Sequence, residues 1–483
     1  MIELVAIAIT LGAVLYHSFG LGIAEIAVVG GAVFVLTFMI IRSRRGVLLG
    51  LLLAGACMLG GIAVWNADAP VPTELYGKRA FEAKVISVNR QLEKTSIIVK
   101  DKEFGERIQV GTTEKGLLPG DSITVRADVE PPEDFVTQTG RLFGYTDYLK
   151  SKGISGLAKN AIVVVVKDGG FSLARIATII RFKIADIFAD RIVFPFDGVL
   201  AGMIVGYQGG IPSSIQDLFK NTGVLHVLVL SGYNITMLAG FLAILLKGLP
   251  MKVRIGITIT LIVLLVLVSG SGVASVRAGI MGSIALVGSL SLRTYQPMRA
   301  LVLSYLLFFF ISPGTIFADP GFHLSFLATM FMILVLPKVE LLFRFIPKTN
   351  HIDLRELIML ALSAPIFMLP YTMYFSGNFP LASPVANIVM AVVTPVLSIV
   401  GIFLIALCWL GPVAAFVGTT ISWIGVLILR SLEWSSHMPM WNTPFLASGW
   451  TVLFYAALVF LLFKKEIREY FVQLRSSLQR QTS

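Results

Sequence analysis

Charged residues are scarce in this chain of 483 residues, where Lys, Arg, Asp and Glu together make up 14% of the sequence. A soluble domain carries about 25% charged residues, so most of this chain is not suited to water as its solvent. Apolar runs close to the roughly 20 residues that cross a bilayer recur along the chain. They include residues 23–41, 47–65, 255–268, 324–336 and 452–463. We therefore predict a polytopic α-helical membrane protein.

Motifs for several chemistries are also missing. The two cysteines, Cys57 and Cys408, both lie in apolar runs, which indicates buried small side chains rather than a disulfide framework or a metal site. The sequence has no Walker A loop and no His-Glu-x-x-His pattern, and its five histidines are scattered. We expect no catalytic residues, no metal and no cofactor, so the chain is not predicted to be an enzyme.

The net charge of +11 is unevenly distributed. Residues 1–69 hold three basic and three acidic residues, residues 70–169 hold 15 and 14, and residues 170–483 hold 21 and 11. The excess therefore belongs to the membrane region. It is consistent with the positive-inside rule and attraction to anionic lipids, or with a cationic route for a polyanion, and both can hold together.

Residues 1–66 are predicted to form N-terminal transmembrane helices. The first segment, Ile2–Tyr16, lacks a basic start and a cleavage site, so we do not expect a removable signal peptide. The second helix is followed by Arg42, Arg44 and Arg45, which mark the cytoplasmic side. The third helix then leads outward and places residues 70–167 on the outer face.

Residues 70–167 are predicted to form an exterior OB-like β-barrel domain. Five short runs are rich in β-branched residues and alternate in polarity: Phe81–Val88, Thr95–Lys100, Arg107–Thr112, Ser122–Val129 and Ile162–Val166. Turn sequences such as Leu118-Pro119-Gly120-Asp121 separate them. About five strands in such a length fit an OB-like barrel, with a plain β-sandwich or a membrane-resting hairpin stack as alternatives.

The remaining chain is predicted to return to the membrane. Residues 170–192 have the spacing of an amphipathic helix lying in the interface, and residues 195–465 form the membrane domain. Basic clusters near 247–254, 293–299, 338–355 and 464–468 would mark cytoplasmic loops, which gives about twelve transmembrane helices. Residues 197–210 are typical of a re-entrant or broken helix, and residues 466–483 form a cytoplasmic tail.

Polar and ionisable residues inside a bilayer are costly and are functional candidates. His226 and Asn234 are eight residues apart, which would place them near one face of a helix. Ser231 and the glycine after it could unwind that helix, as in transporters with discontinuous helices. The alternative is a hydrogen-bonded contact between two helices.

Three further candidates follow in the chain. Arg277 comes after Ser269-Gly270-Ser271-Gly272, which predicts a broken helix, although Arg277 could instead be an interfacial arginine that reaches the headgroups. Asp319 precedes Pro320-Gly321 and is either a helix cap or a substrate contact, and His323 beside it is equally ambiguous. Residues 375–380 indicate a turn, after which Asn387 is expected to bond across helices.

These motifs, in this order, resemble the ComEC family of competence proteins, the inner-membrane channels for DNA uptake. The segments that carry the resemblance run from the first helix to about Phe463 and include Phe143–Ile154, Gly198–Gly240, Ser275–Ala278, Asp319–Phe326 and Asn378–Pro384. Many members have His where this chain has Asn234, so a role that rests on an ionisable group at this position does not carry over to this chain. Long members continue into a metallo-β-lactamase-like domain, and because this sequence stops at Ser483 we expect it to lack that candidate nuclease.

The resemblance implies translocation of single-stranded DNA across the bacterial cytoplasmic (inner) membrane during natural transformation. His226, Ser231, Asn234, Arg277, Asp319 and His323 are the candidates for lining the channel or contacting DNA. Expected partners are single-stranded DNA, membrane lipids, a separate exterior DNA receptor, a cytoplasmic ATPase, a nuclease and further copies of this chain in a homo-oligomer. Alternatives are a transporter or channel for another anionic or lipid-linked substrate, and a non-transporting scaffold that presents the β domain.

Overall fold

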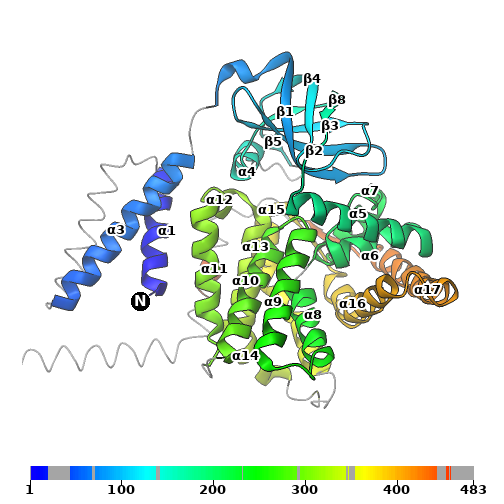
Figure 1. The fold of residues 1–483 in the computed structure, drawn as a ribbon. Coiled ribbons are helices and arrows are strands. Elements are labelled where there is room, and N and C mark those ends of the chain that lie inside the picture. The colour runs from blue at the N-terminus through cyan, green and yellow to red at the C-terminus, as the bar shows by residue number, and fades with distance from the viewer. Residues whose placement is uncertain are drawn as a thin grey trace, which may run out of the picture.

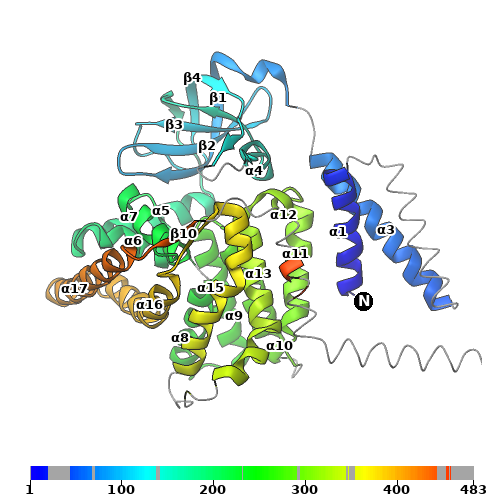
Figure 2. The same cartoon turned by 180° about the vertical axis from the view of Figure 1, so that it is seen from behind.

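The computed structural model describes residues 2–19, 44–67, 71–137, 142–230, 232–290, 294–343, 346, 354–442, 453–455 and 457. Figures 1 and 2 show a β domain above a bundle of helices, with a pair of N-terminal helices to one side of the bundle. The β domain is inserted in the sequence between the N-terminal pair and the bundle.

The β domain consists of strands that range from 2 to 14 residues, with one α-helix between them. Its elements are η1 (Thr73–Leu75), β1 (Gly77–Arg90), β2 (Thr95–Asp101), β3 (Arg107–Thr112), β4 (Ser122–Glu130), β5 (Phe135–Val136), β6 (Leu142–Phe143), α4 (Tyr145–Ser151), β7 (Ile154–Ala158) and β8 (Ile162–Lys167). Burial alternates along β2, where Ile97 and Val99 are fully covered, because successive side chains of a strand point to opposite faces.

The first strand of the sheet pairs with two other strands. The order is β1-β2-β3-β7-β4-β8, and β1 pairs antiparallel with β4 as well as with β2. β3 pairs in parallel with β7. Gly77, which begins β1, lies opposite Val129, whereas Lys167, which ends β8, lies opposite Ser122. The two ends of the domain therefore lie at opposite ends of β4.

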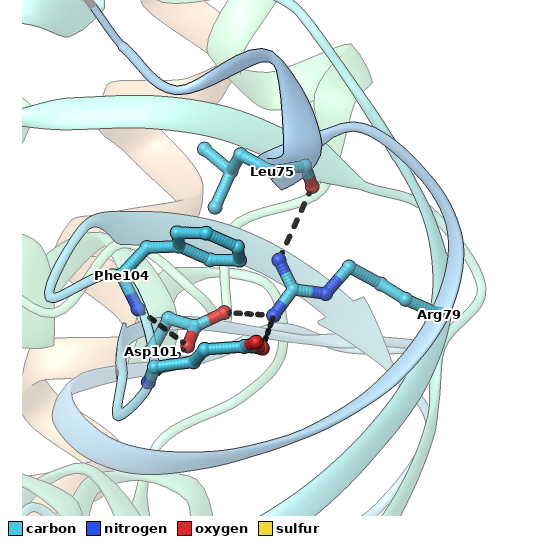
Figure 3. A network of polar contacts seen from close by, with 5 residues as sticks. Leu75, Arg79, Asp101 and Phe104 are labelled. Atoms are coloured by element: carbon cyan, nitrogen blue, oxygen red, sulfur yellow. Dashed lines mark hydrogen bonds and ion pairs between the residues drawn. The ribbon is translucent and has the colours of Figure 1, made fainter.

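A polar network at the rim of this domain holds β1 to the turn after β2 (Figure 3). The Nη2 atom of Arg79 donates to the buried Asp101 carboxylate at 2.7 Å and to Glu103 at 3.1 Å. Asp101 also accepts from the backbone N–H groups of Glu103 and Phe104. The Arg79 guanidinium lies 4.8 Å from the Phe104 ring centroid. Asp101 is thus a buried charge that is fully compensated by its neighbours.

The N-terminal pair is formed by α1 (Ile2–Phe19) and α3 (Arg44–Ala67). A Cβ atom on Gly60 would lie 2.0 Å from the carbonyl oxygen of Ile9, so only glycine permits this close approach of the two helices. The Thr10 hydroxyl lies 2.7 Å from that of Tyr305, which joins α1 to helix α11 (Pro297–Ile311) of the bundle.

Helix α5 (Leu173–Arg191) lies crosswise between the β domain and the bundle (Figure 1). The buried Phe188 packs into the bundle core, while Arg90 of β1 forms an ion pair with Asp186 of α5 at 2.5 Å. A Cβ atom on Gly209 would lie 1.6 Å from the Arg90 carbonyl oxygen, so backbone meets backbone at this junction. The short elements that follow are α6 (Phe196–Val205), α7 (Ser213–Asn221) and η2 (Leu225–Leu228).

The bundle contains both long and short helices. They are α8 (Gly232–Leu245), α9 (Met251–Val268), α10 (Val273–Leu290), α11, α12 (Thr315–Ala318), α13 (Pro320–Leu334), α14 (Leu336–Val339), η3 (Glu340–Phe343), α15 (Leu354–Ser376), α16 (Ser383–Ala406) and α17 (Gly411–Ser436). Two short strands, β9 (Asn378–Pro380) and β10 (Met440–Asn442), pair antiparallel. Among the described residues, five helices are long and apolar enough to cross a membrane: α9, α10, α15 from Ile358, α16 and α17.

These features confirm a helical membrane protein with a separate β domain. Each predicted strand is present, and the sequence missed β7 and the small β5–β6 pair. The expected total of about twelve spans and the domain limits stay predictions. The second helix near 23–41 and the tail at 466–483 lie outside the described residues.

Two local predictions are wrong. Residues Ser269–Gly272 form a turn between α9 and α10 rather than a break within one helix, and Gly279 of α10 faces Ile262 and Val266 of α9 across it. Asn387 donates to the carbonyl and hydroxyl oxygens of Ser383 within α16, so its hydrogen bonds do not cross between helices. For Asn387, a local partner thus satisfies the polar group.

Candidate functional site

Arg277 lies five residues into α10 and is held by uncharged groups. Its Nε donates to the Ser325 hydroxyl at 2.8 Å, and its Nη1 lies 3.7 Å from the sulfur of Met281. Its Nη2 lies 3.4 Å from where a Cβ on Gly232 would be, beside the start of α8. Within the described ranges no carboxylate forms an ion pair with Arg277. Its positive charge is therefore not neutralised by the described part of the fold.

Asn234 and His226 do not share a helix face. His226 is an exposed residue of η2, whereas Asn234 is buried in the first turn of α8, and the chain between them leaves helical geometry at Val229. Asn234 donates to the carbonyl oxygen of Met203 at 2.8 Å and so joins α8 to α6. The predicted interruption is present, but the prediction of one common face is wrong. Ser231 lies outside the described residues.

Asp319 and His323 both serve the start of α13. The Asp319 carboxylate accepts from the backbone N–H of Gly321 at 2.8 Å, which is the geometry of an N-cap. One ring nitrogen of His323 lies 2.7 Å from the Tyr371 hydroxyl of α15, and the other lies 2.5 Å from the Ile316 carbonyl oxygen. Of the two alternatives for Asp319, the cap is present in the structure.

The structure brings some of the candidates together and leaves others apart. Ser325, the partner of Arg277, lies two residues after His323 on α13, so polar contacts run from α10 through α13 to Tyr371 of α15. We refer to Arg277, Ser325, His323 and Tyr371 as the polar row. Within the described part of the chain, no hydrogen bond joins His226 to this row.

A row of aromatic rings, which the sequence did not reveal, leads from the β domain to the polar row. Phe135 of β5 and Phe143 of β6 have ring centroids 5.3 Å apart, and Phe143 lies 5.7 Å from Phe375 at the end of α15. Phe375 stacks on Tyr371 at 6.3 Å, and Tyr371 lies 5.6 Å from the His323 ring. We call Phe135, Phe143, Phe375 and Tyr371 the aromatic row. Its members come from two segments, residues 135–143 and 371–375, that are more than 200 residues apart, so spacing alone carried no signal that they meet.

An ion pair in the β domain fixes that domain to α5. Asp121 is 2% exposed and pairs with Arg175 of α5, and it accepts from the backbone N–H groups of Gly169 and Leu118, each at 2.8 Å. Burial opposes ionisation of this carboxyl, but the N–H donors and the Arg175 guanidinium outweigh it and lower the pKa of Asp121. The junction therefore depends on a charged carboxylate.

A cleft of about 220 Å³ opens at the same junction. Its lining includes Arg90, Phe182 and Lys183, and the Arg90 guanidinium lies 4.9 Å from the Phe182 ring centroid. Elsewhere, no three His, Cys, Asp or Glu side chains within the described part gather closely enough to hold a metal ion. The expectation of no metal and no cofactor stays an expectation.

Comparison with known proteins gives a family match. A family model described as Competence protein matches residues 203–468, more than half of the chain. A protein named ComE operon protein 3, from Bacillus subtilis (strain 168), is 26% identical over 195 residues. That alignment covers 40% of this chain and 24% of the relative, so this chain matches about a quarter of the relative's length. No solved structure matches the chain.

Proposed function

Because this chain belongs to the competence protein family, we propose that it carries single-stranded DNA across the bacterial cytoplasmic membrane during natural transformation. The observation that carries the proposal is the family match over residues 203–468, which contains every candidate from His226 to His323. The chain has helices long and apolar enough to cross a membrane, as such a path needs, and it also has a separate β domain.

The polar row is the proposed contact with the strand. A conduit for DNA needs cations for phosphate and polar groups that replace water. Arg277 meets the first need, because its described partners are the neutral Ser325 and Met281. His323 and Asn234 are engaged in hydrogen bonds between elements, so we propose that they hold the path's walls in place. His226 is exposed and remains a candidate for direct contact.

We further propose that the β domain is a closed OB-like barrel on the outer face. Pairing of β1 with both β2 and β4, and the parallel β3–β7 pair, support a closed barrel. The basic loops of the membrane region support a cytoplasmic location for the side of the helix bundle that faces away from the β domain. They also support about twelve spans with both termini in the cytoplasm. Helix α5 is proposed to lie in the headgroup region beneath the barrel.

The proposed partners follow from the resemblance and from charge. The β domain region holds 15 basic and 14 acidic residues, so it would attract DNA weakly, and we propose that a separate exterior receptor delivers it. A cytoplasmic ATPase and a nuclease are proposed as separate proteins, with this chain itself not an enzyme and without a cofactor. Contact with anionic membrane lipids and assembly into a homo-oligomer are part of the same proposal.

A second candidate function is transport of another anionic or lipid-linked substrate. The observation that favours it is the same unneutralised Arg277, because a small anion would suit that site as well as a phosphodiester does. A non-transporting scaffold for the β domain is a third candidate, which would depend on the β domain but not on Arg277.

The test is the fate of labelled DNA in a competent host from which the gene has been deleted. We expect label to accumulate outside the cytoplasmic membrane in the deletion strain and to reach the cytoplasm after complementation with the wild-type gene. A deletion strain that transforms normally would contradict DNA translocation. Normal DNA uptake together with loss of an anionic solute would instead favour the second candidate.

A further inference from the structure

The aromatic row has one end in the exterior domain and the other end in the bundle. Phe135 is 50% exposed at the outer end, and consecutive ring centroids from Phe135 to His323 lie 5.3–6.3 Å apart. Two more rings flank the outer end, since Tyr145 lies 5.8 Å from Phe135 and stacks on Tyr148 at 6.2 Å. The rings already contact one another, so a ligand would lie against their exposed faces rather than between them.

The charged groups described beside the outer end are one cation and two carboxylates. Lys152 lies 4.1 Å from the centroid of the Tyr148 ring and so provides a cation. On the acidic side, Asp134 accepts from the backbone N–H of Thr146 at 2.9 Å, and Asp147 is exposed. A site with this balance draws little affinity from phosphate, so flat apolar faces would supply most of its binding. Unpaired nucleobases are ligands of that kind, because every base has a face that stacks on an aromatic ring.

A lipid surface is the rival ligand, because Val136 and Leu142 on the same small hairpin are 65% and 61% exposed. Insertion into lipid needs an exposed apolar surface, but it does not need aromatic rings that contact one another in a row. The row instead turns inward from Phe143 to Phe375 at the end of α15, and then to the polar row at His323. This direction favours a ligand that passes from the exterior domain into the bundle.

We propose that the outer end of the aromatic row, Phe135 with Tyr145 and Tyr148 beside it, is a stacking site for the bases of a single DNA strand. From this site in the β domain, the strand passes towards the polar row. The inference rests on the proposed function, because it assigns one section of the strand's path.

The test measures binding of fluorescent oligothymidylate of about 20 nucleotides to the full chain in lipid nanodiscs. An abasic oligomer of equal length presents the same phosphates without bases. The variant is Phe135→Leu, which keeps an apolar side chain and removes the ring. The matched control is Phe171→Leu, because Phe171 is 87% exposed and makes no ring contact with another described residue.

We expect Phe135→Leu to weaken oligothymidylate binding about fivefold, the lower end of the effect of one stacking ring. Binding of the abasic oligomer and the salt dependence of binding should not change, because no charge is removed. Phe171→Leu should match the wild type on both oligomers. Equal affinity of Phe135→Leu and wild type for oligothymidylate would overturn the proposal, as would an equal loss on both oligomers.

The lipid alternative has its own readout. In Phe135→Trp, the added fluorescence relative to wild type should be quenched by oligothymidylate and not by brominated phospholipid. Quenching by brominated lipid alone would make this hairpin a membrane anchor and overturn the proposal.

Failure of this site is separable from failure of the proposed function. If wild-type cells take up DNA while Phe135→Leu binds oligothymidylate normally, only the stacking site is lost. If the deletion strain takes up DNA normally, the proposed function is lost.

Discussion

Replacing Arg277 with methionine tests whether the positive charge of Arg277 is needed for DNA uptake or for stability. Methionine replaces the unbranched aliphatic part of the side chain but removes the guanidinium, and with it the charge and the 2.8 Å hydrogen bond to Ser325. A hydrogen bond from a charged group contributes about 1.5–3 kcal/mol. Against this, an arginine at the centre of a span costs about 2.5–3.5 kcal/mol on insertion scales. Arg277 lies about 6 Å along the axis from Val273, so its cost is smaller, about 1–2 kcal/mol.

The loss of the hydrogen bond and the relief of the cost of burying arginine in the span nearly cancel. We therefore expect Arg277→Met to change the free energy of unfolding by less than about 2 kcal/mol. An arginine that belonged to a buried ion pair would instead cost about 3–5 kcal/mol on removal. DNA uptake should fall about 10- to 100-fold, since a charge-assisted contact to phosphate is lost. The salt dependence of single-strand binding should become shallower by about 0.7 in the log–log slope.

The assays are cytoplasmic uptake of labelled DNA at equal membrane levels, thermal unfolding in detergent, and binding at several salt concentrations. Arg277→Lys is the matched control, because it keeps the charge and should keep most of the uptake. Normal uptake by Arg277→Met would refute the role of Arg277 in the path. A fall in uptake accompanied by a large loss of stability would refute the argument that its charge, rather than its packing, matters.

Two predictions concern the β domain. The lowered pKa of Asp121 means that its contribution to stability is complete above the ordinary aspartate pKa of 3.8 and is lost as the pH falls below that value. Amide protection at the junction with α5, taken relative to the intrinsic exchange rate at each pH, should therefore fall below that pH in wild type. An Asp121→Asn variant that lost protection over the same pH range would contradict this. Arg79→Met leaves the Asp101 carboxylate buried without its cation and should destabilise the domain by about 3–5 kcal/mol. Lys102→Met, which breaks an exposed pair, should cost less than about 1 kcal/mol, and hydrogen exchange along β1 and β2 would measure both.

Local patterns predicted the elements well. The alternation at residues 107–112 predicts a strand with the limits that β3 has. The helical spacing of residues 170–192 predicts α5 to within three residues at either end. Both succeed because the side-chain period of a strand or helix is set within a few residues. β7 escaped prediction because Ile154–Ala158 is short, contains Gly156, and is stabilised by its distant partner β3.

Contacts between residues that are distant in the sequence could not be predicted from the sequence alone. Asn234 and Met203 are 31 residues apart and His323 and Tyr371 are 48 apart, so their pairing depends on how the helices pack. The aromatic row combines residues of β5, β6 and α15, and phenylalanine is too common in a membrane chain for its presence to single these out. Arg277 was identifiable from sequence because a cation in an apolar stretch stands out without knowledge of its neighbours.

The placement of the two ends of the β domain limits how the protein can be rebuilt by genetic engineering. Gly77 lies beside Val129 and Lys167 beside Ser122, so the seven-residue length of β4 between those points separates the two connections by about 23 Å. A replacement module with adjacent termini would draw α3 and α5 together unless a spacer of at least about seven extended residues were added. Chimeras should therefore exchange the domain for another whose termini are equally far apart, and simple excision would disturb the helices on both sides.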